Sequence, residues 1–254
     1  MLIRFINTLQ RRLKKVPPEE KPSGRKSPDP AFSSSTDVRP GVPNRAPAKD
    51  VKESPDKSLG KPAKTNKRAE TAWDLSRFSV PEAEGKTRFH DLDLPAGIMH
   101  AVSDLGFDYC MPIQAEILPK ALGGSDVTGQ AQTGTGKTAA FLINIYTQLL
   151  RNPLNGKRRP GTPRALILAP TRELAMQIEK DALDIGRYTS IRIQSVFGGL
   201  DYEKQKRALA EKPVDIIVAT PGRLMDFQRQ KLIQLNRVEI LVIDEADRML
   251  DMGF

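Results

Sequence analysis

From about residue 87 onward, short apolar segments alternate with longer amphipathic stretches. Strand-like segments occur at 165–169, 191–196, 214–219 and 240–243, of which all but 191–196 are mainly apolar. Continuous apolar runs of this length are typical of strands that are buried on both faces. Because helical patterns separate them, the sequence predicts an α/β fold: a parallel sheet with helices on both faces.

The stretches between these segments carry apolar residues at helical spacing. Leu94, Ile98, Val102 and Leu105 predict one helix. Pro112 favours the start of a second helix, since proline is well tolerated at the first helical position. Its apolar residues are Ile113, Ile117, Leu118 and Leu122, and a later helix after Pro170-Thr171 carries Leu174, Ile178 and Leu183. We expect the globular part to begin near Thr87, with order beginning to return from Trp73, Phe78 and Val80.

Residues 1–15 place Leu2, Ile3, Ile6, Leu9 and Leu13 on one helical face, with most of the arginines and lysines elsewhere. The pattern predicts a short basic amphipathic helix that could lie on an anionic membrane surface or dock on a partner protein. The alternative is a frayed helix without a partner, because isolated helices of this length barely form in water.

Residues 16–72 are rich in Pro, Lys, Ser and Asp, which predicts a disordered basic linker. Residues 1–72 hold 17 Lys and Arg against 8 Asp and Glu, so this segment accounts for the whole net charge of +9. The rest of the chain is electrically balanced. The basic segment could hold RNA loosely through phosphate charge or serve only as a solvated spacer. Any nucleic-acid surface on the globular part must therefore be a local patch.

Several classes of site are disfavoured. Cys110 is the only cysteine, which excludes a disulfide within the chain and fits a reducing cytoplasm. His90 and His100 stand apart from any cysteine or acidic cluster at ligand spacing, so we expect no zinc site. No apolar run approaches the roughly 20 residues that span a bilayer.

The stretch 131–138, which reads Ala131, Gln132, Thr133, Gly134, Thr135, Gly136, Lys137 and Thr138, carries the clearest chemistry. It lies between a short extended segment at Val127-Thr128 and an apolar helix start. Glycines that adopt positive φ let main-chain N–H groups turn toward an anion at a helix N-terminus. Lys137 would reach the β- and γ-phosphates and the Thr138 hydroxyl would ligate Mg²⁺, so ATP and Mg²⁺ are the expected ligands. Ala131 replaces the first glycine of the general pattern, and a chance strand-to-helix turn is the alternative.

The strand at 240–243 leads directly into Asp244-Glu245-Ala246-Asp247. A buried strand can hold carboxylates rigidly at its C-terminal end, beside a phosphate-binding loop. Asp244 would hold the Mg²⁺ shell and Glu245 would orient the attacking water, so we name Glu245, Asp244 and Lys137 as the catalytic residues. The alternative is that the two acids cap the following helix.

Three further loops follow strands. They supply hydroxyls, glycine amides and arginines at Pro170-Thr171-Arg172, Gly198-Gly199 and Thr220-Pro221-Gly222-Arg223. Such groups suit contacts with a nucleic-acid backbone. Helix capping by Thr171 and ordinary turns would explain each loop separately.

These motifs, in this order, resemble those of DEAD-box ATP-dependent RNA helicases. Residues 106–114 (GFDYCMPIQ) resemble the family's Q motif, with Phe89 as its upstream aromatic; otherwise this segment reads as a helix–turn–helix corner. The loops at 170–175 and 220–224 resemble motifs Ia and Ib, and 240–247 resembles Walker B in its DEAD form. Gln130 and residues 248–251 also fit. The chain is most similar to bacterial members of the degradosome-associated type.

The resemblance implies a RecA-like ATP-binding domain over residues 73–254 in which Gln114 reads the adenine edge and Phe89 stacks on the base. It implies that Pro170, Thr171, Arg172, Gly198, Gly199, Thr220, Gly222 and Arg223 contact the RNA backbone without reading sequence. Family members close two RecA-like domains on ATP and RNA. Because this chain stops at Phe254, soon after the acidic segment, we expect it to lack the second domain and the rest of the first, to bind nucleotide weakly and not to unwind RNA. The competing hypotheses are a P-loop DNA translocase and a non-catalytic module that binds RNA or a partner.

Overall fold

The structure is a computed structural model that describes residues 1–5, 73–132, 134–154 and 156–253. The remainder of the expected amphipathic helix (6–15) and the expected linker (16–72) lie outside the described residues. Both therefore stay predictions, as do the partners proposed for them.

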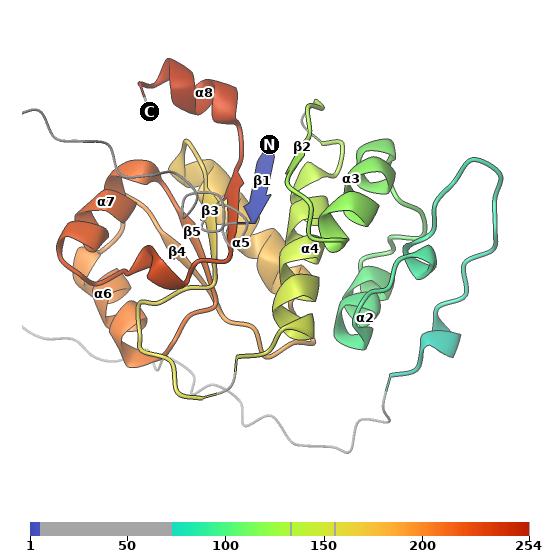
Figure 1. The fold of residues 1–254 in the computed structure, drawn as a ribbon, viewed down its shortest axis with the longest axis horizontal. Helices are drawn as coiled ribbons and strands as arrows, with labels where there is room; N and C mark the ends of the chain where they lie inside the picture. Colours follow the sequence, from blue (N-terminus) through green and yellow to red (C-terminus); the bar gives the residue numbers. More distant parts are fainter. Residues whose placement is uncertain (6–72, 133, 155, 254) are drawn as a thin grey trace, which may run out of the picture. The chain divides into compact units, whose positions relative to one another are not determined.

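The described residues form an α/β fold around a six-stranded sheet (Figure 1). Its strands run in the order β2-β1-β6-β3-β5-β4, and β3 pairs in parallel with β5 and β6, while β4 pairs in parallel with β5. The fold prediction is confirmed for this mostly parallel sheet. The strands are β1 (Leu2–Phe5), β2 (Val127–Thr128), β3 (Ala165–Leu168), β4 (Ile193–Val196), β5 (Ile216–Ala219) and β6 (Ile240–Ile243).

The prediction of a helix at the N-terminus is wrong for residues 2–5, which form β1. This strand lies between β2 and β6 and runs antiparallel to both, so the sheet is not parallel throughout. Two neighbouring strands satisfy the main-chain groups of β1 on both edges, whereas a single helical turn leaves most of its terminal groups unpaired. In β1 the Ile3 side chain has no exposed surface, whereas in a helix on the protein surface it would stay partly exposed.

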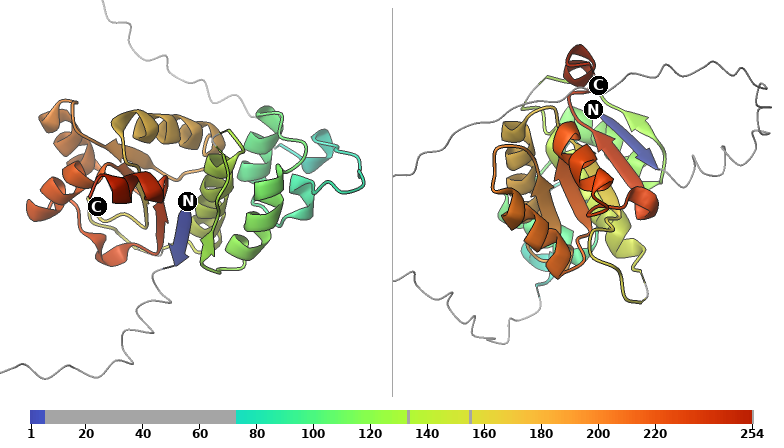
Figure 2. Two further views of the ribbon diagram at one scale, coloured as in Figure 1. Left: turned by 90° about the horizontal axis from the view of Figure 1, so that it is seen from above. Right: turned by 90° about the vertical axis from the view of Figure 1, so that its left-hand side faces the viewer.

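Helices cover both faces of the sheet (Figure 2). One apolar cluster joins the strands to α4 (Lys137–Arg151) and α5 (Arg172–Ile185), with α2 (Ala96–Asp104) and α3 (Pro112–Leu122) packed beyond them. A second cluster joins the opposite face to α6 (Tyr202–Glu211) and α7 (Pro221–Arg229). Along β3, Ile167 belongs to the first cluster and Leu166 to the second, as the alternation of side chains along a strand requires. The last helix, α8 (Ala246–Asp251), follows β6 directly.

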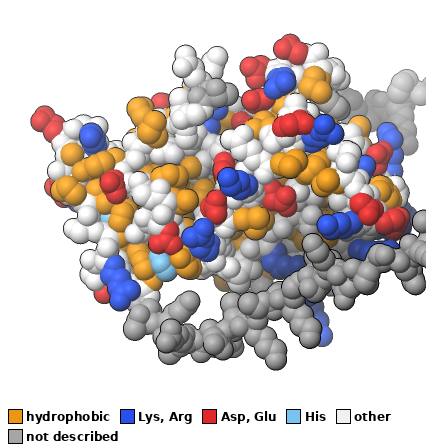
Figure 3. Space-filling view, turned by 180° about the vertical axis from the view of Figure 1, so that it is seen from behind, with side chains coloured by type: hydrophobic (Ala, Val, Ile, Leu, Met, Phe, Trp, Pro, Cys, Tyr) orange, Lys and Arg blue, Asp and Glu red, His pale blue; other side chains and the backbone are white. Residues whose placement is uncertain are grey.

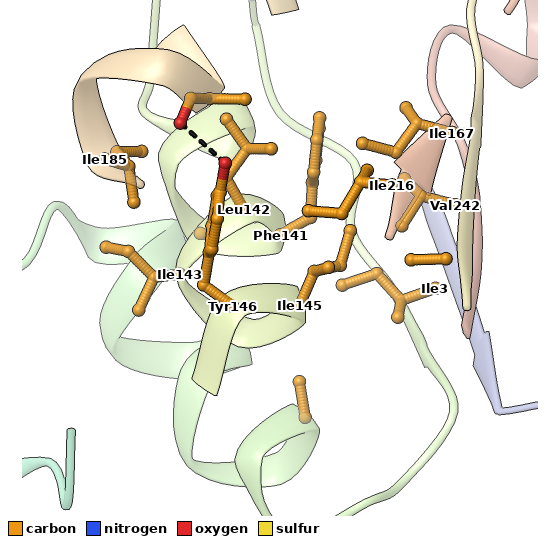
Figure 4. Close-up of a cluster of buried hydrophobic side chains, with 14 of the residues drawn as sticks. Ile3, Phe141, Leu142, Ile143, Ile145, Tyr146, Ile167, Ile185, Ile216 and Val242 are labelled. Atoms are coloured by element: carbon orange, nitrogen blue, oxygen red, sulfur yellow. Dashed lines mark hydrogen bonds between the residues drawn. The ribbon is translucent and has the colours of Figure 1, made fainter. Parts of the chain in front are cut away.

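The first cluster is a continuous core that also contains Ile3 (Figure 4). Tyr146 is its largest fully buried side chain, and its hydroxyl donates a hydrogen bond of 2.7 Å to the carbonyl of Ala182. This bond satisfies the one polar group that the ring brings into the core. Burial raises the pKa of Tyr146, so the hydroxyl stays protonated and ties α4 to α5.

The segment before α2 packs onto the domain through Trp73, Phe78 and Val80, the last two of which are buried. The Trp73 ring stacks on His100 of α2 with centroids 4.9 Å apart, and His100 stacks on Tyr188 with centroids 3.5 Å apart. Short 3-10 turns occur at Leu75–Arg77, Phe89–Asp91 and Leu235–Arg237.

Positive and negative side chains are interspersed on the face of the domain shown in Figure 3. This agrees with the balanced charge of the sequence after residue 72. Within the part of the chain that the structure describes, we find no helix long and apolar enough to cross a membrane.

Candidate nucleotide and RNA site

All the predicted functional loops leave the same edge of the sheet. Parallel strands bring their carboxyl ends together, so the segments that follow β6, β3, β5 and β4 lie in that order along one edge. The phosphate loop (residues 129–136) follows β2, which runs in the same direction. Because β1 runs the opposite way, its first residue, Met1, also lies at this edge, beside Gly129.

The phosphate loop has the backbone of an anion cradle. Gly134 and Gly136 adopt φ of +82° and +86°, the left-handed region that glycine enters without strain, and Gly136 is the N-cap of α4. The first N–H groups of a helix have no partner within it, so they are free to bind phosphate oxygens. Within the loop, the Thr135 hydroxyl donates to the carbonyl of Gln132 over 2.8 Å. Thr133 lies outside the described residues.

The Lys137 ammonium lies across the loop that precedes it. Its Nζ donates to the carbonyl of Gln132 at 2.6 Å and to the carbonyl of Ala131. Two carbonyls hold the cation at the mouth of the cradle without neutralising its charge. A bound phosphate would therefore meet a positive charge that is already positioned.

Asp244 ends β6 as a buried carboxylate with 4% of its surface exposed. Burial raises the pKa of Asp244 above its usual value, while a hydrogen bond from the Glu245 N–H to Oδ1, 3.1 Å long, opposes the shift. A buried carboxylate has lost its contact with water, so its ionised form is stabilised by a nearby cation. Such a group is suited to holding a metal ion.

Glu245 departs from ordinary backbone geometry. Its φ and ψ of 47° and 50° lie in the left-handed region, which is uncommon for a residue with a side chain. Strain of this kind, of order 1–3 kcal/mol, persists where the surrounding structure enforces it, often at functional sites. The carboxylate accepts a hydrogen bond from Arg248 over 3.3 Å, so its position is fixed from α8.

The phosphate loop and the acidic segment (residues 244–247) line one cavity of about 940 Å³. Thr138 and Asp244 both line it, and their hydroxyl and carboxylate are the hard oxygen ligands that Mg²⁺ prefers. Among the described residues we find no cluster of three or more histidine, cysteine or acidic side chains able to hold a metal. Two protein oxygens nevertheless fit Mg²⁺, which usually keeps several waters and shares substrate phosphates.

The structure does not support the expected stacking of Phe89 on a base. Phe89 has no exposed surface, and its ring lies behind Phe107, with centroids 6.2 Å apart. Phe107 lines the cavity instead. A ring buried in the core can support the aromatic wall of the site but cannot itself contact a ligand.

Gln114 is also buried, and its side chain forms hydrogen bonds to main-chain groups of two different segments. Its Nε2 donates to the carbonyl of Gly136 over 3.1 Å, and its Oε1 accepts from the main-chain N–H of Met111 over 2.9 Å. A Cβ at Gly136 would lie only 2.5 Å from Nε2, so this close approach requires glycine. The side chain thus joins the start of α3 to the N-cap of α4. Its predicted contact with adenine stays untested.

Two of the three predicted RNA loops meet in the structure. Thr171 is the N-cap of α5 and its hydroxyl accepts from the N–H of Leu174, so the structural alternative is present. Arg172 is exposed, and its guanidinium lies against Gly199, where an added Cβ would be 2.9 Å from Nη1. The adjoining Pro170 and Gly198 belong to the same two loops, which therefore form one continuous surface.

The third loop starts α7, with Thr220 as the N-cap and Pro221 in the first turn. Gly222 is exposed, while the Arg223 guanidinium packs over the rings of Tyr202 and Phe227 at 5.2 and 5.5 Å. The Arg223 guanidinium thus makes cation–π contacts within the protein and is only partly available to a ligand. Gly222 is therefore the exposed residue of this loop, whereas Thr220 and Arg223 are half-buried.

Sequence reasoning missed several groups that line the cavity. Phe107 belongs to the segment 106–114, which the sequence analysis singled out. The sequence does not tell whether Phe89 or Phe107 faces the cavity, because this depends on how deeply each ring is buried in the fold. Asp181 and Asp184 of α5 and Met1 belong to none of the motifs singled out in the sequence. Cys110 does not line the cavity, and burial raises the pKa of its thiol to about 11, so it is no nucleophile at neutral pH.

Comparison with known proteins agrees with this geometry. Residues 111–254 match the DEAD/DEAH box helicase family. The chain is 57% identical over 175 residues to the "ATP-dependent RNA helicase RhlB" of Pseudomonas aeruginosa and to that of Pseudomonas putida, an alignment that covers 69% of this chain and 44% of each relative. It is 53% identical over 167 residues to the protein of that name from Xanthomonas oryzae pv. oryzae, covering 65% of this chain and 29% of the relative.

The chain thus spans less than half the length of these relatives. The family match covers more than half of this chain and includes both the phosphate loop and the acidic segment. The chain belongs to the DEAD/DEAH box helicase family.

Proposed function

We propose that this chain supplies the ATP-binding half of an ATP-dependent RNA helicase. The observation that carries the proposal is the convergence of Lys137, Thr138, Asp244 and Glu245 on one cavity. A cation, a hydroxyl and two acids at the carboxyl edge of a parallel sheet match the needs of phosphoryl transfer.

The residues have distinct roles in this proposal. Lys137 and the first amides of α4 bind the phosphates, and Thr138 and Asp244 would hold Mg²⁺, which when bound neutralises charge on the phosphate oxygens. Glu245 accepts a hydrogen bond from the attacking water and orients it. The ring of Phe107 provides the apolar wall against which a base would lie.

RNA would lie along the other part of the same edge. The loops at 170–172, 198–199 and 220–223 offer an exposed arginine, glycine amides and a hydroxyl. Such groups follow a phosphate backbone rather than read bases. This supports RNA binding without sequence specificity.

Duplex unwinding is proposed for the whole protein. The relatives extend well beyond the matched region, and we propose a second RecA-like domain that closes on ATP and RNA and contributes an arginine to the transition state. A cytoplasmic location and a role in RNA degradation belong to the same proposal; they rest on the single cysteine and on the resemblance to degradosome-associated helicases.

The test is ATP hydrolysis with and without single-stranded RNA. We would measure it for this chain and for a protein extended to the length of its relatives. We expect RNA-stimulated turnover in the extended protein only. Replacing Glu245 with Gln should lower that turnover by about 100-fold or more, because removing one group aimed at the transition state has costs of this order.

Two controls make the test specific. Lys137→Ala should weaken Mg²⁺-ATP binding by about 100-fold through loss of charge-assisted hydrogen bonds. Lys120→Ala, which removes an exposed lysine of α3 paired with Glu116, should leave binding unchanged. Hydrolysis that ignores RNA and Glu245 in the extended protein would favour the non-catalytic binding module instead.

A further inference from the structure

Basic residues are concentrated at the edge of the sheet that lies opposite the candidate site. Residues 156–164, 190–192 and 211–215 lead into β3, β4 and β5, and we call these three segments together the basic edge. They hold six Lys and Arg against two Asp and Glu, whereas the chain after residue 72 is balanced. In Figure 1 the first segment belongs to the yellow loop between α4 and β3, at the end of the sheet away from α8. The domain therefore carries a local surplus of positive charge.

A single carboxylate brings the three segments together. Asp215 is buried, and its Oδ1 lies 2.6 Å from the Arg158 guanidinium, while its Oδ2 accepts a hydrogen bond of 2.9 Å from the main-chain N–H of Arg192. Lys212 lies three residues before this carboxylate. Because both oxygens of Asp215 are engaged, its charge is already committed within the basic edge.

Four cations of the basic edge remain unpaired. Lys157, Arg159, Arg192 and Lys212 are exposed, and none of them forms an ion pair with a residue that the structure describes. The second acid of these segments, Glu211, is exposed as well. Like charges gathered on one surface repel each other and attract anions from solution. Their accumulation here favours a polyanionic ligand.

The loop that presents two of these cations is held firmly. Arg164 is almost fully buried and donates two hydrogen bonds of 2.8 Å to the carboxylate of Glu239. The Thr162 hydroxyl donates to the carbonyl of Arg159 over 2.6 Å. Lys157 and Arg159 therefore extend from a backbone that is already ordered, which lowers the entropy cost of binding a ligand.

We propose that the basic edge is a second RNA-binding surface, which contacts the phosphate backbone of RNA that extends beyond the loops at the opposite edge. The proposal rests on the proposed function, because it assigns a further contact to the same substrate. β4 begins directly after Arg192 and ends shortly before Gly198, and six extended residues span about 20 Å. RNA longer than this span can contact both surfaces.

The chemistry of the basic edge favours RNA over an acidic protein. None of the large hydrophobic side chains that are exposed in the described chain lies in these three segments. Stable protein interfaces are centred on buried aromatic or aliphatic side chains, which the basic edge does not offer. Ammonium and guanidinium groups without such anchors are suited to a phosphate backbone.

Two triple variants that lose the same charge test the proposal. The edge triple replaces Lys157, Arg159 and Lys212 with Gln, and the control triple replaces Arg77, Lys120 and Lys180 with Gln; all six residues are exposed. The basic residues before position 73 are present in both variants. Binding of single-stranded RNA of about 25 nucleotides would be measured by fluorescence anisotropy at several salt concentrations, without nucleotide.

We expect the edge triple to bind this RNA about 10-fold more weakly or worse, and to lower the salt dependence by about two, as the loss of three phosphate contacts on a single strand requires. The control triple should stay within about 3-fold of the unaltered chain. Replacing Lys157 and Lys212 with Arg keeps the charge and should preserve binding. Thermal melts should show no lower unfolding midpoint in either triple, because exposed charges contribute little to stability.

Equal RNA affinities of the two triples would overturn the proposal. An edge triple that binds RNA normally but loses binding to polyglutamate would also overturn it, and would identify an acidic protein as the partner. Failure of the proposed function is a separate result. If the extended protein hydrolyses no ATP while the edge triple still loses RNA affinity, the helicase assignment fails and the basic edge stands.

Discussion

The strands β6, β3, β5 and β4 form one half of the sheet and β2 and β1 form the other, and the two halves are held by different means. In the first half each strand has four residues, pairs in parallel over its whole length and is covered on both faces. In the second half a two-residue strand depends on an antiparallel neighbour from the other end of the sequence. The RNA loops follow the first half, whereas the phosphate loop follows the second.

This difference separates stability from ligand affinity. The strands of the first half pack against the two apolar clusters, so changes there unfold the whole domain. A short strand with one partner can loosen while the rest stays folded. The nucleotide site should therefore respond to local changes that leave the RNA loops unaffected.

The largest expected effect comes from the centre of the first half. Ile167 of β3 is fully buried, and Ile167→Ala should lower the free energy of unfolding by about 2–5 kcal/mol, through lost transfer energy and a residual cavity. Urea denaturation measures this change. Leu183→Ala on the exposed face of α5 is the control and should cost less than about 0.5 kcal/mol. Similar losses in the two variants would contradict the comparison.

A smaller effect is expected at the RNA loops. Arg172 is exposed and, among the described residues, its only ion pair is with its neighbour Glu173, so Arg172→Ala should leave the fold intact. We expect weaker binding to single-stranded RNA and a salt dependence reduced by about one phosphate contact, measured by fluorescence anisotropy at several salt concentrations. Affinity for Mg²⁺-ATP should not change. Arg229→Ala at the end of α7 provides the control, and an equal effect there would remove the case for a specific RNA surface.

The smallest effect concerns Asp244 and has an unusual sign. Because burial raises the pKa of Asp244, the folded chain retains this proton at a pH where the unfolded chain has lost it. Stability without Mg²⁺ should therefore fall as the pH rises above about 3.8, and it should level off beyond the folded pKa.

Asp244→Asn should remove this slope and raise the unfolding midpoint at neutral pH by a few degrees, while it weakens Mg²⁺-dependent nucleotide binding. Thermal melts between pH 4 and pH 7.5 would measure both effects. Asp181, whose pKa burial also raises, keeps its contribution in this variant. A midpoint that falls at neutral pH would show that the carboxylate stabilises the fold.

The sequence predicted the first half of the sheet well, for a physical reason. Continuous apolar runs such as 240–243 can be satisfied only by burial on both faces, and the loops after them carry recognisable chemistry. Pro112 likewise marks the start of α3, because its fixed φ and missing N–H suit that position.

In the second half, β2 was expected as the extended segment at Val127-Thr128, whereas β1 escaped prediction because its structure is decided by distant partners. Leu2 and Ile3 fit a helical face as well as a strand, and only the open edges of β2 and β6 favour the strand. Phe89 and Phe107 are both aromatic, and their sequence does not tell which ring faces the cavity. The left-handed backbone of Glu245 likewise follows from the way β6 turns into α8.

Trp73 can serve as an intrinsic fluorescence probe, because its ring stacks on His100 of α2. Trp73 is the only tryptophan in the chain, so all intrinsic indole fluorescence originates beside α2. The signal will follow the docking of the first residues after position 72 and the integrity of the neighbouring helices. It will not follow events at the phosphate loop unless these travel through α4 and α5. A nucleotide titration that changes this emission would thus reveal communication across the domain.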